Sequence, residues 1–454
     1  QERFSEEGAP KYILPFSRTK DDIKKRYEEV TSEIPFAPDG LKDDKNIEKM
    51  VGLYVPYYLY DYSVHGRVDY DGVREVESST ERFTYFAHVN MYFNTDDLKI
   101  PFDASETLDD TIAEKLEPFP LDDLEKFNPN YLAGFFVENT SVDKNLYTEE
   151  SLDNAVDYAF DRGKGGIVYK TSQAKEQIAK NSLRQKVRLK DVEGAYLPMY
   201  FSTAKYGDRE AYSIANGVTG NTYIDMPIDK RKMFYSALFT SLVIFILLLA
   251  ASTMFSFSYK IKNICSFAAL VSSIIALTGA KLARETYDSD NHIYDKGFNP
   301  NAKRRVKPNK KKKTNSLPKI DVSGTMIVII LVSAPSFIAM IFAGAAGFAT
   351  SSIGSFFIQA LIYIASAIIC IKAIATARGD RRALILGVLG YILSVTIRLI
   401  DMPNDLYYYG AMVGVFAVIL LSINAMVSEY NRFATHPSPQ FMKKGGGLEN
   451  AKNN

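Results

Sequence analysis

The side chains with the most direct chemistry are two cysteines and four histidines, namely His65, His88, His292 and His436. The histidines do not fall at metal-ligand spacings, although His65 and His88 could approach each other across paired strands. Cys265 and Cys370 both lie in apolar stretches, where a free cysteine behaves as a small hydrophobic residue. These residues therefore predict neither a metal site nor a disulfide framework.

Motifs for phosphate binding or nucleophilic catalysis are not apparent either. The glycines on both sides of Lys164 lack the length and order of a phosphate-binding loop. No serine stands in a nucleophile elbow. The acidic pairs Asp109–Asp110 and Asp122–Asp123 are typical of helix starts and solvated surfaces. The sequence predicts no catalytic residue and no cofactor-binding residue in this chain.

Long apolar stretches dominate the chain from Phe234 onward, and a helix needs about 20 such residues to cross the hydrocarbon core of a bilayer. Six segments are candidates: Phe234–Phe255, Ile264–Ala280, Gly324–Phe348, Ser355–Ala377, Ala383–Ile400 and Tyr407–Val427. Backbone groups in lipid must be hydrogen-bonded internally, so we expect helices. This divides the second half into two helices in 233–283, a basic loop in 284–323, four helices in 324–428 and a flexible tail in 429–454.

Basic residues predict the orientation of these helices. The loop between the second and third spans carries the densest cluster: Lys303, Arg304, Arg305, Lys307, Lys310, Lys311, Lys312 and Lys313. The segment before the first span and the loop between the fourth and fifth spans are also basic. With six spans, all three regions fall on one side, so we expect a multi-pass bacterial cell-membrane protein with both termini cytoplasmic. The cluster itself could bind anionic lipid headgroups or simply determine topology, and the second interpretation is favoured.

Two ionisable residues at the end of the fifth span, Arg398 and Asp401, could line a polar path. They lie at the interface, where long side chains reach water, so an anchoring role is favoured. No charged pair is expected at mid-membrane depth, which weakens the case for an ion-coupled transporter.

Residues 1–230 read as a soluble α+β domain with an antiparallel sheet. Apolar alternation predicts strands at Tyr12–Phe16, Leu53–Tyr62, Arg82–Met91 and Ala195–Ser202. Helical periodicity predicts helices at Asp21–Thr31, Leu108–Glu117, Glu150–Phe160 and Ser172–Gln185. Asn-Gly within Tyr212–Tyr223 predicts a β-hairpin just before the membrane.

One short motif occurs twice in this domain. The glycine, tyrosine and proline of the first copy recur in the second at the same spacing: Gly52, Tyr54, Pro56, Gly194, Tyr196 and Pro198. We interpret this as a duplicated strand–helix unit covering 10–105 and 165–228. Because proline lacks a ladder donor, each copy is expected on an edge or at a bulge. A binding groove between the copies is conceivable, although a purely structural repeat is favoured.

The soluble half resembles a family of bacterial membrane proteins described as containing a TFIIB-type zinc ribbon. The resemblance rests on motifs that recur in the same order over about residues 10–230: Tyr12–Phe16, Gly52–Asp61, Asn130–Gly134, Ala211–Gly220 and Met226–Asp229. It implies a zinc ribbon ahead of the first strand. No ribbon cysteines occur here, so any zinc is expected only in a segment upstream of Gln1, or the ribbon was lost. The resemblance implies no enzymatic activity.

These observations favour a non-enzymatic membrane adaptor whose cytoplasmic domain binds a protein or peptide at the inner membrane face. Membrane lipids and a protein partner or second copy are its expected contacts, and nucleic acid is not. The alternative is a transporter or channel component with a gating cytoplasmic domain. An enzyme acting on a membrane-embedded substrate is a third, less favoured hypothesis.

Overall fold

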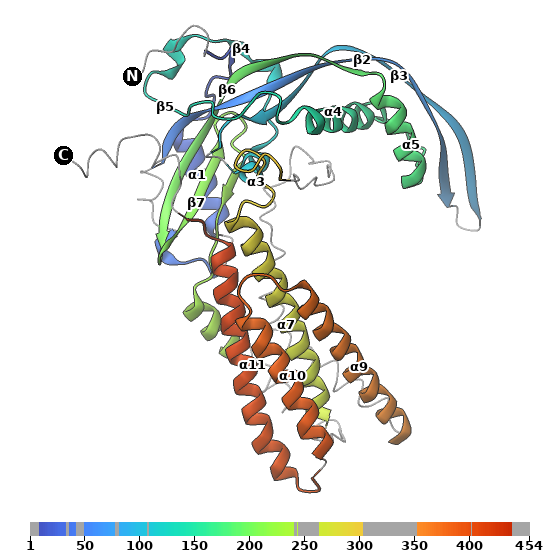
Figure 1. Cartoon of the computed structure of the whole chain (residues 1–454), viewed down its shortest axis with the longest axis vertical. Coiled ribbons are helices and arrows are strands. Elements are labelled where there is room, and N and C mark those ends of the chain that lie inside the picture. Colours follow the sequence, from blue (N-terminus) through green and yellow to red (C-terminus); the bar gives the residue numbers. More distant parts are fainter. Residues whose placement is uncertain are drawn as a thin grey trace, which may run out of the picture.

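A computed structural model describes residues 9–32, 36–41, 50–77, 81–106, 109–239, 243, 263–302, 352–400 and 402–437. Figure 1 shows a strand-rich part that carries the N-terminal half of the chain, and a bundle of long helices that extends from it. The predicted α+β domain followed by apolar helices is thus confirmed.

Eight strands form one sheet with the central order β3-β2-β6-β1-β4. Their bounds are β1 (Tyr12–Ile13), β2 (Val51–Glu77), β3 (Arg82–Asp103), β4 (Glu125–Lys126), β5 (Phe136–Val137), β6 (Val187–Tyr206), β7 (Arg209–Asn216) and β8 (Thr222–Ile224). Strand β5 adds to β2, and β7 lies between β6 and β8. The predicted hairpin is confirmed, because β7 and β8 pair with Ile214 opposite Tyr223. The strands β2 and β3 are much longer than predicted.

The two copies of the repeated motif are neighbouring strands. In the β2–β6 ladder Gly52 lies opposite Tyr200 and Tyr58 lies opposite Gly194, with the pair Val55–Leu197 at the centre. The segments are therefore related by a local twofold rotation in the middle of the sheet. No groove separates them, and the duplication of a larger unit remains a prediction.

The prediction that both prolines lie on an edge or at a bulge is wrong. Pro56 and Pro198 occupy β2 and β6, the two strands that pair in the middle of the sheet, opposite Tyr196 and Tyr54. Their carbonyls accept from Ala104 N and Gly217 N, on the sides away from the shared β2–β6 ladder. In a strand, the N and the C=O of one residue point to the same side. The N–H groups that the two prolines lack would therefore also face away from the β2–β6 ladder, at points where one neighbouring strand ends and the next begins.

Helices cover the sheet and bury its apolar side chains. They are α1 (Lys20–Ser32), α3 (Asp110–Leu116), α4 (Thr148–Gly163) and α5 (Gln173–Arg184), with short 3-10 helices at Asp39–Leu41, Leu121–Asp123 and Pro129–Leu132. The four predicted helices and four predicted strands are all present, with shifted ends. Fully buried aromatic rings such as Tyr60, Phe102 and Phe160 form the centre of the largest apolar cluster.

Four described helices are long and apolar enough to cross a bilayer. They are α7 (Asn263–Asp290), α9 (Ser352–Thr376), α10 (Arg382–Ile400) and α11 (Asp405–Phe433). They match the second, fourth, fifth and sixth predicted spans. Of the first span, residues 234–239 are helical and all but one of the rest lie outside the described residues, as does the whole of the third. The basic cluster at 303–313 and Asp401 also lie outside them.

Two helices extend past the ends expected from hydropathy. Helix α7 continues to Asp290 and α11 continues to Phe433, so the predicted starts of the basic loop and of the tail fall inside helices. The added turns are polar, and their side chains are held by the sheet rather than by lipid. Hydropathy marks the end of the apolar run, and tertiary contacts here set the end of the helix.

Gly217 provides a test of the packing around the β7–β8 connection. A Cβ at this position would lie 2.5 Å from Phe16 and 2.9 Å from Pro198. Phe16 has little room to move, because its ring stacks on Phe135 with centroids 4.3 Å apart. Gly217→Ala should lower the free energy of unfolding by about 1–3 kcal/mol through overpacking. Thermal unfolding of the full chain in detergent measures this, with Gly40→Ala as the control.

The control position has open space around its Cβ within 4 Å. Equal melting temperatures for the two variants would contradict the packing described here.

Candidate functional site

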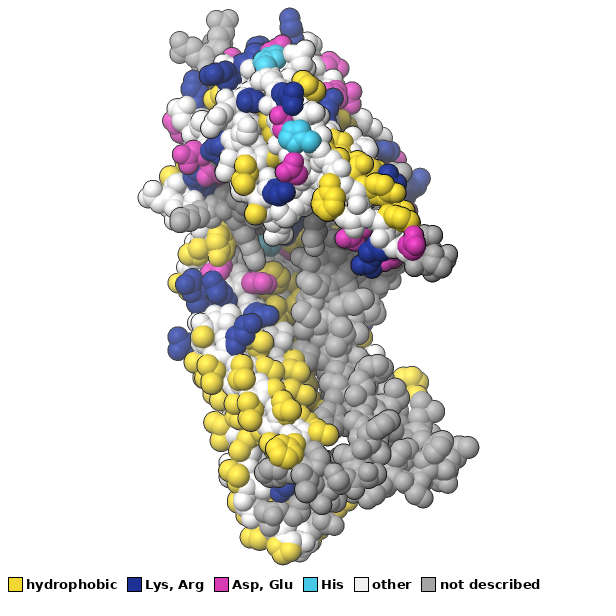
Figure 2. Space-filling view, turned by 90° about the vertical axis from the view of Figure 1, so that its right-hand side faces the viewer, with side chains coloured by type: hydrophobic (Ala, Val, Ile, Leu, Met, Phe, Trp, Pro, Cys, Tyr) yellow, Lys and Arg dark blue, Asp and Glu magenta, His cyan; other side chains and the backbone are white. Residues whose placement is uncertain are grey.

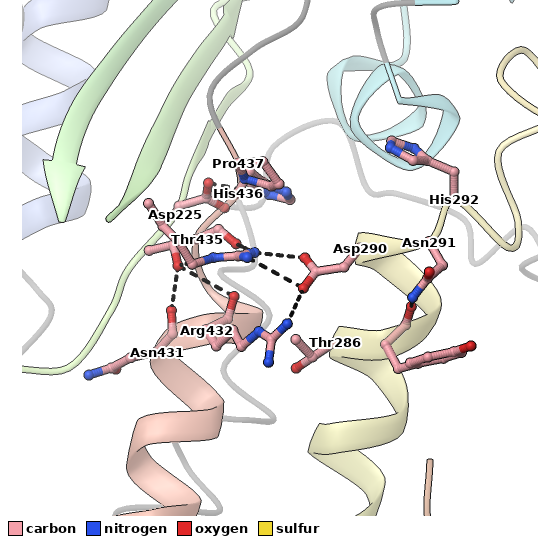
Figure 3. Close-up of polar contacts among 12 residues, drawn as sticks. Asp225, Thr286, Asp290, Asn291, His292, Asn431, Arg432, Thr435, His436 and Pro437 are labelled. Carbon is pink, nitrogen blue, oxygen red and sulfur yellow. Dashed lines mark hydrogen bonds and ion pairs between the residues drawn. The ribbon is translucent and has the colours of Figure 1, made fainter. Parts of the chain in front are cut away.

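The ends of α7 and α11 meet the sheet in a polar joint. Figure 3 shows that Asp290, the last residue of α7, faces Arg432 of α11. Its carboxylate accepts from Arg432 at 3.0 Å and from Arg209 of β7 at 2.8 Å. Arg209 also donates to the Thr435 carbonyl at 2.6 Å. One carboxylate thus links two of the apolar helices to one strand of the sheet.

The chain beyond α11 adds to the sheet. His436 and Glu210 of β7 exchange both backbone hydrogen bonds, at 2.8 and 2.9 Å. The His436 ring stacks on Tyr212, and its Nε2 lies 3.3 Å from an oxygen of Asp225. Asp225 is buried and accepts from Tyr212 N and Tyr223 OH. This carboxylate therefore anchors the segment after α11 to the β7–β8 hairpin.

A side-chain amide completes the joint. Asn431 of α11 accepts from Ile228 N at 2.7 Å and donates to Ile228 O at 2.9 Å. Its amide thereby pairs with a buried backbone segment as a neighbouring strand would. Asn431 also donates to the Tyr206 hydroxyl at 2.8 Å. Asp225, Asn431 and Thr435 are buried in the joint, and each of these side chains is hydrogen-bonded.

A second polar group lies beside the joint, where the turn after α7 meets the start of α3. His292 Nδ1 lies 3.1 Å from Asp295 Oδ2 and 3.7 Å from Asp109 Oδ2. The hydrogen bond that the His292 ring donates to the Asp295 carboxylate raises the pKa of His292. Burial raises the pKa of Asp295, and the nearby carboxylates of Asp109 and Asp110 raise it further.

The β2–β3 hairpin extends far beyond the rest of the sheet. Strand β6 pairs with β2 only as far as Val64, so residues 65–77 and 82–94 form a two-stranded extension, which we call the arm. Figure 1 shows the arm curving away from the sheet, with α4 and α5 against one face. That face is apolar: Val68, Tyr70 and Met91 are buried against the helices.

The arm exposes aromatic rings along its length. Phe86 is 79% and Tyr92 73% exposed on the face away from the helices, and Phe83 and Tyr85 are about half exposed on the other face. In Figure 2, viewed from the side of the arm, apolar side chains cover the helix bundle and a smaller group lies on the strand-bearing part. In the part of the chain that the structure describes, no strand other than β2 pairs with β3.

The structure changes the interpretation of the histidines. His65 pairs with Asn94 and Asp96, whereas His88 pairs with Asp71 six residues along β2, about 20 Å away at strand spacing. The two do not approach each other. His292 and His436, which spacing left without partners, lie instead in or beside the joint. His292 contacts Asp295, three residues along the chain, and also the distant Asp109, whereas His436 lies beside Asp225. No sequence pattern connects the two distant pairs.

Comparison with known proteins identifies similarity to an uncharacterized protein but no family. No family model matches the chain, and no solved structure matches it. The chain is similar to an uncharacterized protein of Bacillus subtilis, YdjG, with 28% identity over 247 residues, which is 51% of this chain and 68% of the relative. This similarity carries no statement about activity.

The contacts of the joint predict that the stability of the protein depends on Asp290. In Asp290→Asn, the largely buried guanidinium of Arg209 loses its charged acceptor, which should cost about 1.5–3 kcal/mol of unfolding free energy. Thermal unfolding of the full chain in detergent measures the loss. Glu77→Gln is the control, because the Glu77–Arg82 pair is solvent-exposed and should contribute no more than about 1 kcal/mol. Equal effects of the two variants would show that the joint is not stabilising.

Proposed function

We propose that this chain is a non-enzymatic membrane adaptor that binds an extended segment of a partner protein along the outer edge of its arm. The 22-residue strand β3, with one unpaired edge among the described residues, is the observation that carries the proposal. An open strand edge offers unpaired N–H and C=O groups to an added strand.

The part of β3 in the arm lacks the features that normally protect an edge. Such edges usually carry lysine, proline or bulges that prevent pairing with other chains. From Phe83 to Thr95 the strand contains no lysine, arginine, acid or proline, and its ladder with β2 is unbroken from Arg82 to Thr95. Retaining a long, uncharged edge with exposed aromatic rings is consistent with a surface that a partner covers.

The aromatic residues give this edge anchors of the kind found at protein interfaces. Phe86 and Tyr92 project from the same face of β3, with Arg67 of β2 over the Tyr92 ring at 5.7 Å. Tyrosine, other aromatic residues and arginine are enriched at binding hot spots. Backbone pairing would supply affinity, and pockets between these rings would select the partner's side chains.

The membrane helices give the arm its location. The four apolar helices, together with the basic cluster at 303–313, support a multi-pass protein of the bacterial cell membrane with both termini cytoplasmic. Lipid headgroups are the ligands proposed for that cluster. In this arrangement the arm stands at the inner face of the membrane and recruits its partner there.

Charge on the outer face of the arm should abolish partner binding. The partner is detected in native membranes by photo-cross-linking from a benzoylphenylalanine placed at Thr84. We expect the double variant Phe86→Lys/Tyr92→Lys to reduce this cross-linking by about tenfold or more. Phe136→Lys is the matched control, because Phe136 is also exposed but lies on β5.

Equal cross-linking in both variants would contradict the proposal. The proposal would also be contradicted if no partner were cross-linked and vesicles reconstituted with the purified chain showed solute flux. This is the result expected of a transporter.

A further inference from the structure

Asp109, His292 and Asp295 form a compact group of metal-ligating atoms. One ligand atom from each residue lies within 4.8 Å of the other two. Asp109 directly precedes α3, whereas His292 and Asp295 lie in the turn after α7. The group therefore links the sheet domain to a membrane helix, and Figure 3 shows His292 placed between the end of α7 and the domain.

The spacing suits a shared ion. Protein ligands bind divalent metals at about 2.0–2.2 Å, so two atoms at neighbouring coordination positions lie about 3.0–3.5 Å apart. His292 Nδ1 lies 3.1 Å from Asp295 Oδ2 and 3.7 Å from Asp109 Oδ2. Small side-chain movements would bring all three atoms onto one ion.

Surrounding contacts orient two of the three ligands. Asp295 Oδ1 accepts from Phe298 N at 3.1 Å, which leaves Oδ2 facing His292. The Phe298 ring stacks on the His292 ring with centroids 4.4 Å apart. Such second contacts fix the direction of metal ligands in known sites.

The electrostatic environment favours a cation. Asp295 is buried, and Asp110 next to it is buried as well. Asp110 accepts from Tyr147 OH and Lys296 N, which are neutral donors. The ammonium of Lys296 is directed to Glu150 and the Leu146 carbonyl. Grouped carboxylates in a shielded site attract a divalent ion.

We propose that Asp109, His292 and Asp295 bind a divalent transition-metal ion of the Mn²⁺ to Zn²⁺ series, which ties the start of α3 to the turn after α7. One imidazole nitrogen and two carboxylate oxygens suit these ions better than Ca²⁺ or Mg²⁺, which prefer oxygen ligands alone. The three protein ligands leave further coordination positions to water. The ion would make the connection between the sheet domain and the helices depend on metal, independently of any partner at the arm.

The test uses the full chain in detergent after removal of metal with EDTA, and Zn²⁺ and Mn²⁺ as probes. Isothermal titration should find one Zn²⁺ per chain, and the melting temperature should rise with Zn²⁺ concentration because the ion binds the folded state. In Asp109→Asn and His292→Ala, Zn²⁺ affinity should fall at least tenfold. His65→Ala is the control, because His65 also contacts an aspartate but lies on the exposed arm.

Pulsed EPR of bound Mn²⁺ adds a signature that a protein-wide stability change would not produce. The wild type should show coupling to one imidazole nitrogen, and His292→Ala should lose it. Each variant is compared with the wild type by size exclusion and circular dichroism in EDTA. If His292→Ala fails to fold, Asp109→Asn decides the outcome. The proposal is overturned if the wild type binds neither ion, or if folded Asp109→Asn binds Zn²⁺ as the wild type does.

Discussion

The position of the sheet domain on the helices depends on the ion pairs that the Asp290 carboxylate makes. Asp290 ends α7, accepts from Arg432 of α11 and accepts from Arg209 of β7. Ion pairs at exposed surfaces contribute little, but this one is largely shielded, and its arginine also bonds the backbone of the segment after α11. Around it, Asn431 and His436 pair with backbone groups of the sheet domain. The sheet is thereby attached to the helices through several directional contacts.

This attachment matters for the proposed role of the arm. A two-stranded ribbon is marginally stable alone, and the arm is supported by α4 and α5 on one face only. Its other face and its β3 edge are left accessible among the described residues. The sheet is itself joined to the apolar helices and holds this edge at a fixed position relative to them, as the proposed recruitment of a partner to a membrane requires.

Local pattern explains how much of this could be predicted. The apolar runs of α9, α10 and α11 and the periodicity of α4 and α5 located those helices, because burial in lipid or in a core imposes composition directly. The prediction included most of the β3 half of the arm but ended β2 at Tyr62. Val68 and Tyr70 do alternate with Arg67 and Asp69 in the missed segment, but Gly66 and Gly72, a residue type depleted in strands, interrupt the pattern. The repeated motif was visible, but its two copies' pairing with each other was not, since register depends on tertiary contacts. The contacts of His292 with Asp109, and of Asp290 with Arg209, join residues with no sequence relation, so only the fold reveals them.

The most direct test of this account is whether the sheet domain is held rigidly on the helices. Spin labels at Thr84→Cys on the arm and Ile385→Cys on α10 occupy exposed positions in the two halves. Pulsed EPR of the full chain in lipid nanodiscs should give one narrow distance distribution. A broad or multi-peaked distribution in the otherwise wild-type protein would show that the joint does not fix the domain, and would contradict the account.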